Sequence, residues 1–257
     1  MRKQRGKYPE LILKIIQDSD IILEVLDARF IEETRNPDIE EQIKKQGKRL
    51  IYVLNKSDLL LKKEKKINLD YSVLISCKER EDIKKLRDLI KISSKKIKKS
   101  FGEKIIVGII GYPNTGKSSL INLLIGKSSA GVGSEAGFTR GIQKLRLDEN
   151  ISILDSPGVI PEKQYSHTEK DKISKQTIAG GRSYSQVKDP EIVVAKLITA
   201  YPQILEKFYN IDAKGDSEIL IEELGRKKGF LKKGGLVDEN RTAKFILRDW
   251  QTGEIKI

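Results

Sequence analysis

The residues with the clearest chemistry form a glycine-containing loop between an apolar stretch, Ile105–Ile110, and a helical pattern that begins at Lys117. The loop matches the pattern GxxxxGK[ST] and reads Gly111-Tyr112-Pro113-Asn114-Thr115-Gly116-Lys117-Ser118. Glycines in this setting let successive backbone N–H groups turn toward phosphate oxygens, and the N-terminus of the following helix favours negative charge. The segment therefore predicts a phosphate site in which Lys117 reaches the β- and γ-phosphates and the Ser118 hydroxyl binds Mg²⁺.

A second candidate, Asp155-Ser156-Pro157-Gly158, follows a short apolar stretch, Ile151–Leu154, and matches the pattern DxxG. Alone, this pattern usually marks a turn, but after a strand and a phosphate loop it indicates the magnesium side of the same site. We expect Asp155 to hold the ion through water and the Gly158 amide to contact the γ-phosphate. Between the two motifs, Thr139 is a candidate magnesium ligand in the triphosphate state only, although a lone threonine in a polar loop is ordinarily structural.

A third motif, Asn55-Lys56-Ser57-Asp58, comes directly after the apolar stretch Leu50–Leu54 and matches NKxD. The Asp58 carboxylate accepts two hydrogen bonds, which suits the N1–H and exocyclic amine on one edge of guanine. Adenine lacks that donor pair and would leave the carboxylate unpaired. Asn55 is expected to contact the far edge of the base, and the Lys56 stem to lie along the ring. In isolation the same tetrapeptide would more often be a turn or a helix cap.

A further apolar stretch, Leu69–Ile75, ends in Ser76-Cys77-Lys78. This triplet resembles the SAK loop of guanine-nucleotide-binding proteins, in which the middle backbone N–H reads the guanine oxygen. Two strands that each end in such a motif favour a guanine site over two unrelated turns.

The order of these motifs is unusual, because the guanine motifs precede the phosphate loop, whereas in most G proteins they follow it. In this respect the chain resembles the circularly permuted GTPases of the YlqF/YawG type, which act in ribosome biogenesis. The likeness covers nearly the whole chain. It includes Asp27-Ala28-Arg29, which resembles the DAR element of that family, and a tail with Gly234-Gly235, Asp238, Ala243 to Asp249 and Gly253.

The resemblance implies GTP or GDP as ligand, GTP hydrolysis as the activity and Mg²⁺ as the cofactor. The expected nucleotide-binding residues are Asn55, Lys56, Asp58, Ser76, Cys77, Lys78, Asn114, Thr115, Gly116, Lys117, Ser118, Ser119, Asp155 and Gly158. The expected metal ligands are Ser118, Thr139 and Asp155. Lys117, Thr139 and Gly158 are expected to act in catalysis.

How water is positioned for hydrolysis is left open by the sequence. Many GTPases place a glutamine after DxxG, but this chain has Val159, so slow intrinsic turnover is expected. Asn114 occupies the position that binds K⁺ in similar GTPases, or else it is a polar loop residue capped locally. The single histidine, His167, is either a bystander, the commoner case, or a catalytic group. A catalytic residue supplied by RNA or by the ribosome is an equal alternative.

Apolar runs of strand length alternate with helical patterns, which indicates an α/β fold with a mostly parallel sheet flanked by helices. The expected strands are Ile21–Leu26, Leu50–Leu54, Leu69–Ile75, Ile105–Ile110, Ile142–Leu147 and Ile151–Leu154. The expected helices are Tyr8–Gln17, Asp38–Gln46, 79–99, Lys117–Ile125, Ile192–Tyr209, Ser217–Gly225 and Glu239–Trp250. Residues 1–177 are interpreted as the permuted P-loop GTPase-like domain. Residues 178–257 are interpreted as a small α-helical C-terminal domain that binds RNA or the ribosome.

Composition adds a hypothesis about partners. The 257 residues carry a net charge of +13, which favours nucleic acid, or else reflects the ion-pair surface of a heat-loving organism. Two basic segments, Lys95–Lys99 and Gly225–Gly235, suggest phosphate contacts, with Phe230 either stacking on RNA or packing in a small core. One cysteine and no apolar run of spanning length indicate a cytoplasmic monomer without a membrane partner.

Three functions remain in competition. The leading one is a GTPase switch in large-subunit assembly that binds ribosomal RNA. The second is a GTP-dependent RNA-binding module with negligible hydrolysis, which Val159 keeps open. The third is a GTPase of small-subunit or tRNA processes. Permuted relatives of that third kind usually carry a zinc module, which one cysteine and one histidine cannot build.

Overall fold

The computed structural model describes residues 7–61, 69–100, 102–126, 143–147, 149–155, 170–201 and 203–257. The chain divides into two compact units. The first, here called the sheet unit, comprises Met1–Asp58 and Lys62–Tyr165. The second, the helical unit, comprises Leu59–Leu61 and Ser166–Ile257. The boundary expected from the sequence, 177/178, lies at the end of one of the helices of the second unit.

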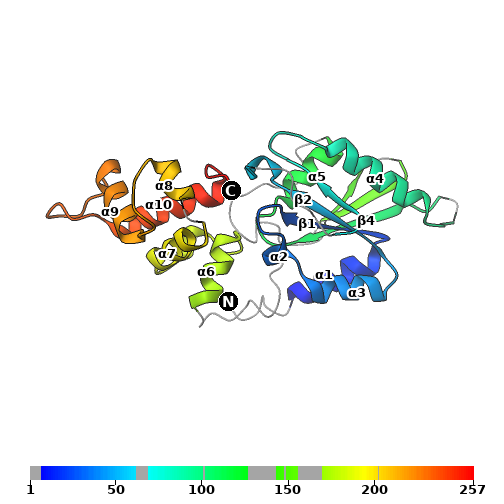
Figure 1. Ribbon diagram of the computed structural model, residues 1–257. Helices are drawn as coiled ribbons and strands as arrows, with labels where there is room; N and C mark the ends of the chain where they lie inside the picture. The colour runs from blue at the N-terminus through cyan, green and yellow to red at the C-terminus, as the bar shows by residue number, and fades with distance from the viewer. Residues whose placement is uncertain are drawn as a thin grey trace. The chain divides into compact units, whose positions relative to one another are not determined.

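The sheet unit is built on six strands in the order β3-β2-β1-β4-β6-β5 (Figure 1). Their bounds are β1 Ile21–Asp27, β2 Arg49–Asn55, β3 Ser72–Leu74, β4 Ile105–Gly111, β5 Gln143–Arg146 and β6 Ile151–Asp155. Every neighbouring pair is parallel except β5 and β6, which run antiparallel. The mostly parallel sheet expected from the sequence is confirmed.

Helices cover both faces of this sheet. Figure 1 shows α1 (Lys7–Asp18) and α3 (Pro37–Lys45) on one face and α4 (Ile83–Lys95) and α5 (Lys117–Ile125) on the other. The short helix α2 (Ile31–Thr34) and the 3₁₀ turn Ser57–Leu59 follow strand ends. Because this sheet is covered on both faces, β1 and β6 are buried at every position, and most of their residues are apolar.

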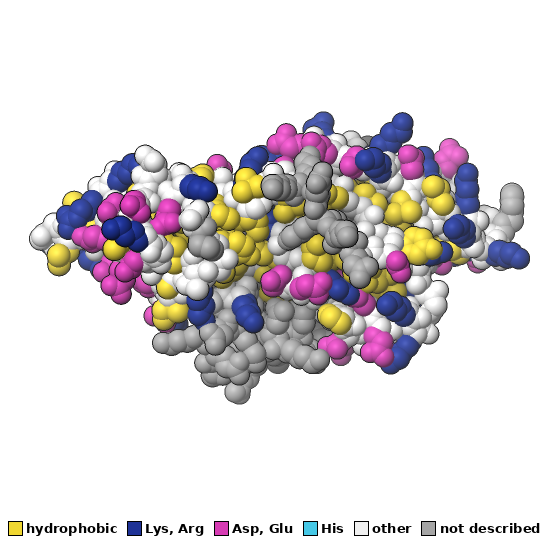
Figure 2. All heavy atoms as spheres, in the orientation of Figure 1, with side chains coloured by type: hydrophobic (Ala, Val, Ile, Leu, Met, Phe, Trp, Pro, Cys, Tyr) yellow, Lys and Arg dark blue, Asp and Glu magenta, His cyan; other side chains and the backbone are white. Residues whose placement is uncertain are grey.

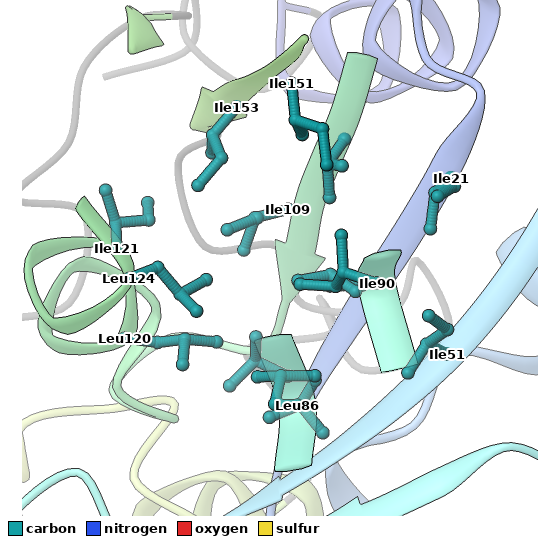
Figure 3. Packing of buried hydrophobic residues seen from close by; sticks show 14 of the residues in the cluster. Ile21, Ile51, Leu86, Ile90, Ile109, Leu120, Ile121, Leu124, Ile151 and Ile153 are labelled. Atoms are coloured by element: carbon teal, nitrogen blue, oxygen red, sulfur yellow. The ribbon is translucent and has the colours of Figure 1, made fainter. Parts of the chain in front are cut away.

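The core on the α4/α5 face is aliphatic (Figure 3). Leu86 and Ile90 of α4, with Leu120, Ile121 and Leu124 of α5, pack against strand residues. Burying one such side chain fully contributes about 1.5–3 kcal/mol, so this face stabilises the edge of the sheet that carries the motifs. The strand residues labelled in Figure 3 are Ile21, Ile51, Ile109, Ile151 and Ile153.

Helix α4 begins later than the sequence pattern suggested. The expected span was 79–99, whereas the helix runs from Ile83 to Lys95. Residues 76–81 form a turn closed by the bridge between Ser76 and Glu81, and Asp82 has a positive φ of 55°, so the helix cannot start before Ile83. The apolar period is nevertheless right, since Ile83, Leu86 and Ile90 are all buried.

On the opposite face, α1 lies close to the sheet at Gly108. A Cβ atom at this glycine would collide with the Ser19 hydroxyl and with the side chain of Ile15. Glycine therefore permits the close approach of helix and strand here.

The helical unit contains five helices within the described residues. They are α6 (Lys170–Ile178), α7 (Pro190–Ala200), α8 (Ile204–Tyr209), α9 (Ser217–Lys228) and α10 (Glu239–Thr252). Helix α10 packs against α6, α7 and α9, and its Trp250 is fully buried. The Trp250 Nε1–H donates to the Ile178 carbonyl at 3.0 Å, and the ring centroid lies 5.0 Å from that of Tyr201. None of the described helices of the chain combines the length and apolar character needed to cross a membrane.

The single helix expected over Ile192–Tyr209 is wrong. The structure has two helices there, because α7 ends at Ala200 and α8 begins at Ile204. Tyr201 precedes a proline, which disfavours the helical region for that residue, and its φ and ψ are −130° and 67°. Gln203 then has a positive φ of 68°. The chain therefore turns between the two helices.

Residues 59–61 belong to the helical unit although they follow the NKxD motif directly. The Ile257 N–H donates to the Leu59 carbonyl at 2.9 Å, and the Leu61 N–H donates to the Ile257 carbonyl at 2.7 Å. The Leu59 side chain is buried and lies against Gly253, where a Cβ atom would be 2.8 Å from Leu59 Cδ1. The segment after the NKxD motif is thus joined to the last residue of the chain.

Candidate nucleotide-binding site

The motif residues lie at one edge of the sheet. Parallel strands end on the same side, and the carboxyl ends of such strands form the ligand crevice of open α/β folds. The motif residues at or just beyond these ends, in spatial order across the sheet, are Ser76 after β3, Asn55 on β2, Asp27 on β1, Gly111 on β4 and Asp155 on β6. Motifs far apart in the sequence therefore share one edge.

Asn55 joins the guanine motif to the phosphate loop. Its Nδ2 donates to the Thr115 carbonyl at 2.8 Å, and its Oδ1 accepts the Cys77 backbone N–H at 3.0 Å. A Cβ atom at Gly116 would collide with Asn55 Nδ2, so the loop approaches this side chain as closely as a glycine permits. Asn55 is 2% exposed. Through these two hydrogen bonds it links the NKxD loop to the phosphate loop and to the loop that contains Cys77.

The Asp58 carboxylate is oriented by Ser76. The Ser76 hydroxyl donates to Asp58 Oδ1 at 2.6 Å and accepts the Glu79 backbone N–H at 3.0 Å. Burial, with a smaller effect of Asp58, raises the pKa of the neighbouring Cys77 thiol to about 12, so this thiol stays protonated at neutral pH. Lys78, the last residue of the triplet, is exposed.

A buried ion cluster stands behind Lys56, and the sequence motifs assigned it no role. Asp27 accepts the Lys56 ammonium at 2.8 Å and the Arg29 Nη2 at 2.9 Å, while its other oxygen accepts the Arg29 Nε at 3.0 Å. Burial alone would raise the pKa of Asp27, but Lys56 and Arg29 outweigh it and hold that pKa well below its usual range. Asp27 therefore fixes the lysine that is expected to lie along the base. The signal in the sequence was the DAR triplet directly after a buried strand.

The phosphate loop is closed by Lys117 in this structure. The Lys117 Nζ donates to the carbonyls of Gly111 at 3.1 Å and Tyr112 at 2.8 Å. Burial lowers the pKa of this lysine to about 8, Asp155 opposes the shift and Lys56 adds to it. An anion at the loop would raise this pKa again, because it favours the charged form of the lysine. Gly116, at the start of α5, has φ 95°, which favours glycine.

Two described residues suit a magnesium ion. Asp155 is 1% exposed at the end of β6 and close enough to Lys117 to influence its pKa. Ser118 lies half-buried in the first turn of α5, beside the phosphate loop. A carboxylate and a hydroxyl are hard oxygen donors, which Mg²⁺ prefers together with water and phosphate oxygens.

Comparisons with known proteins agree with this geometry. Residues 106–221 match the family described as 50S ribosome-binding GTPase. The chain is 40% identical over 263 residues to the GTP-binding protein MJ1464 of Methanocaldococcus jannaschii. The matched region covers 99% of this chain and 68% of that protein. Its fold matches GNP-bound YlqF from T. maritima with a TM-score of 0.67 at 24% identity, over 96% of this chain and 94% of that one.

The chain belongs to the YlqF/YawG family of circularly permuted GTPases. Eukaryotic relatives are longer: the chain is 33% identical to the guanine nucleotide-binding protein-like NSN1 of Arabidopsis thaliana but covers 48% of its length. It is 30% identical to the nuclear GTP-binding protein NUG1 of Saccharomyces cerevisiae and covers 56% of it. The chain thus spans about half the length of these two proteins.

For this permuted GTPase, the structure brings together the candidate residues Asn55, Lys56, Asp58, Ser76 and Cys77 with the phosphate loop and Asp155. Thr139, Gly158 and His167, three further candidates, lie outside the described residues, as does Val159. Their roles stay predictions. Asn114 lies in the phosphate loop with a positive φ of 59°, a conformation in which asparagine is among the better tolerated side chains.

Proposed function

We propose that this protein is a GTP-hydrolysing switch that acts in assembly of the large ribosomal subunit by binding ribosomal RNA. The observation that carries the nucleotide part is the hydrogen bond from Asn55 to the Thr115 carbonyl, because it joins the base-reading motif to the phosphate-binding motif. The ribosomal part is supported by the family description, 50S ribosome-binding GTPase, and by the net charge of +13.

In the proposed site, Asp58 accepts the guanine N1–H and exocyclic amine, and the Lys56 stem lies along the base. Ser76 and Asp27 orient these two side chains through the contacts at 2.6 and 2.8 Å. Asn55, Cys77 and Lys78 complete the base side. The order of the network before any ligand binds lowers the entropic cost of binding.

On the phosphate side, residues Asn114 to Ser119 surround the β- and γ-phosphates. Lys117 exchanges its two carbonyl contacts for phosphate oxygens, which its burial makes favourable. Ser118, Asp155 and Thr139 would hold Mg²⁺, Asp155 through water, and the ion would neutralise charge on the phosphate oxygens. The Gly158 amide would contact the γ-phosphate.

Hydrolysis in this proposal is slow without a partner, since Val159 stands where many GTPases have glutamine. Asn114 would bind a K⁺ ion that supplies positive charge to the γ-phosphate, and His167 is the weaker catalytic candidate. The protein would act as a cytoplasmic monomer on ribosomal particles, contacting RNA through Lys95–Lys99 and Gly225–Gly235.

In both basic segments, some of the described lysines are exposed and others bond to groups of the protein itself. Lys99 bonds to Asp20 at 2.7 Å, and Lys227 donates to the Tyr209 carbonyl at 2.9 Å. Lys95, Lys96 and Lys98 are exposed. On the face shown in Figure 2, Lys and Arg side chains alternate with Asp and Glu side chains. Local groups of cations are therefore a better guide to an RNA contact than the overall charge.

The test measures GTP turnover with and without purified 50S subunits, in K⁺ and in Na⁺. We expect turnover to rise with subunits and to be faster in K⁺, and we expect subunit binding to be salt-sensitive and stronger with a GTP analogue. Asn114→Ala should remove the difference between the cations. Turnover that stays negligible under all conditions, with RNA binding intact, would favour the RNA-binding module instead. Equal rates in both cations would discard the role of K⁺.

A further inference from the structure

A hollow on the helical unit has the composition of a binding site. It lies between α8, the end of α9 and α10, and its volume is about 640 Å³. This is within the range of sites that hold small molecules or single nucleotides, roughly 300–1,000 Å³. Its main side chains are Phe208, Tyr209, Lys227, Lys228, Phe245 and Arg248.

One aromatic ring of the hollow is left in solvent. Phe208 is 44% exposed, while its ring contacts Tyr209 edge-on at a centroid distance of 4.9 Å. Phe245 is half-buried and leans on Phe230 at 5.4 Å and on Tyr209 at 6.5 Å. Phe230 thus packs within the unit, and Phe208 is the ring available to an external planar group.

Cations are layered on the same aromatic group. The Arg248 guanidinium lies 4.4 Å from the Phe245 centroid, and the Lys228 ammonium lies 5.3 Å from it. In the described part of the chain, Lys228 has no carboxylate within ion-pair distance, so its charge is available to a ligand. The Arg248 side chain is 46% exposed and ends in a planar guanidinium, which makes it a second stacking surface.

The acidic groups of the hollow are largely satisfied within the protein. Asp249 accepts the Arg248 Nη2 at 2.9 Å and the Tyr209 hydroxyl at 3.1 Å. Because burial and Asp249 raise the pKa of Tyr209, the hydroxyl stays a donor to this carboxylate. Lys227 is held by the Tyr209 carbonyl. Glu254, which is exposed and also lines the hollow, can accept a hydrogen bond from the exocyclic amine of a base.

The geometry points to a site for one unpaired nucleotide of single-stranded RNA. Its base lies in the hollow against Phe208 and the layer of Arg248 on Phe245, and its phosphates meet Lys228. Sequence-tolerant RNA sites combine aromatic or guanidinium faces with cations in this way. This inference rests on the proposed RNA binding and narrows it to named side chains. The loop that follows α9, residues 229–237, carries the exposed lysines Lys232 and Lys233, which would contact further phosphates of the same RNA strand.

The experiment uses the full chain and a short single-stranded oligoribonucleotide that contains 2-aminopurine, whose fluorescence is quenched when the base stacks. Phe208→Ala is expected to weaken binding roughly tenfold and to reduce the quenching at saturation. Lys228→Ala is expected to weaken binding and to make it less dependent on salt concentration, because one phosphate contact is lost. Quenching at saturation should persist in this variant. A duplex of the same length should bind without quenching and with no sensitivity to Phe208.

Matched controls separate the hollow from general surface effects. Ile219→Ala removes another exposed apolar side chain of the helical unit, and Lys175→Ala removes another exposed lysine. Both should bind the oligonucleotide as the unsubstituted chain does. Equal weakening by the controls, or full affinity and full quenching in Phe208→Ala, overturns the site.

The outcome is separable from that of the proposed function. If 50S association is salt-sensitive, and Phe208→Ala changes neither this association nor oligonucleotide binding, the inferred nucleotide site is wrong and the proposed function stands. If Phe208 matters for the oligonucleotide while 50S subunits neither bind nor stimulate turnover, the ribosomal assignment is wrong and the hollow stands. If Phe208 matters for 50S subunits but not for any RNA freed of protein, the hollow binds protein and the inference is overturned.

Discussion

The carboxyl edge of the sheet and the hollow of the helical unit differ in how far their key side chains are exposed to solvent. At the sheet edge, Asp27, Asn55, Lys117 and Asp155 are each at most 7% exposed, and Asp27, Asn55 and Lys117 already hydrogen-bond to protein atoms. In the hollow, Phe208 and the cations stand in solvent. The first site is ordered as part of folding, whereas in the proposed second site Phe208 and Lys228 would lose side-chain freedom when a ligand binds. Substitutions at the edge should therefore affect stability and binding together.

The largest effect is expected for Asp58→Asn at the base side. The amide would turn one of its donors toward the guanine donors, so GDP affinity should fall roughly 10⁴-fold. Xanthosine diphosphate, which has a carbonyl where guanine has its amine, should bind the variant better than GDP does. Calorimetric titration with both nucleotides checks this, with Asp70→Asn, an exposed aspartate, as the control. Retained preference for GDP would show that Asp58 does not read the base.

Trp250→Ala is expected to change the unfolding free energy by a similar amount, but without a loss of GDP binding. Trp250 is fully buried and donates to the Ile178 carbonyl. Removing it should destabilise the helical unit by about 4 kcal/mol. GDP affinity should stay within about twofold, because the two units are separately compact. Calorimetric unfolding with and without GDP makes the measurement, and loss of nucleotide binding together with unfolding of the helical unit would contradict it.

A smaller loss, about 3 kcal/mol of unfolding free energy, is expected from Asp27→Ala, because the variant removes the buried carboxylate that Arg29 and Lys56 share. GDP affinity should fall as well, since Lys56 loses its anchor. Urea denaturation and nucleotide titration measure the two effects. The control is Glu41→Ala, whose partner Lys45 is 70% exposed, and it should leave the stability nearly unchanged. Equal effects of the two substitutions would remove the distinction between buried and exposed pairs.

The smallest effect concerns Glu24, three residues before Asp27 on β1. Burial, and next the charge of Glu40, raise the pKa of Glu24 to about 8. The folded state therefore holds a proton that the unfolded state releases near pH 4.5, so this contribution is full below that pH and is lost as the pH rises toward 8.

The variant Glu24→Gln should remove this dependence. Its stability should fall less than that of the unsubstituted chain between pH 5 and pH 8, a difference of about 1 kcal/mol or more. The Asn36 N–H donates to Glu24 Oε1 at 3.0 Å, and glutamine can retain that bond. Urea midpoints at several pH values measure it, and parallel curves for the two proteins would refute the raised pKa.

Much of the sheet unit was predictable from local pattern. Ile105–Ile110 and Lys117–Ile125 were recognised because an apolar run, a glycine loop and a helical period follow one another. Helix α6 was missed, since few of its residues are apolar, and it is held by neighbours: the Gln251 amide donates to the Thr177 carbonyl at 2.7 Å. The division of Ile192–Tyr209 into two helices had a signal in Pro202, but the apolar period on both sides concealed it.

By itself, the sequence determined the chemistry of each loop, because a phosphate loop or an NKxD motif depends on residue types a few positions apart. Only the tertiary structure decided that Asn55 bonds to Thr115, that Asp27 holds Lys56, and that Leu59 pairs with Ile257. These contacts join positions up to about 200 residues apart. Which distant groups meet is set by strand order and burial, and these depend on the packing of the whole unit.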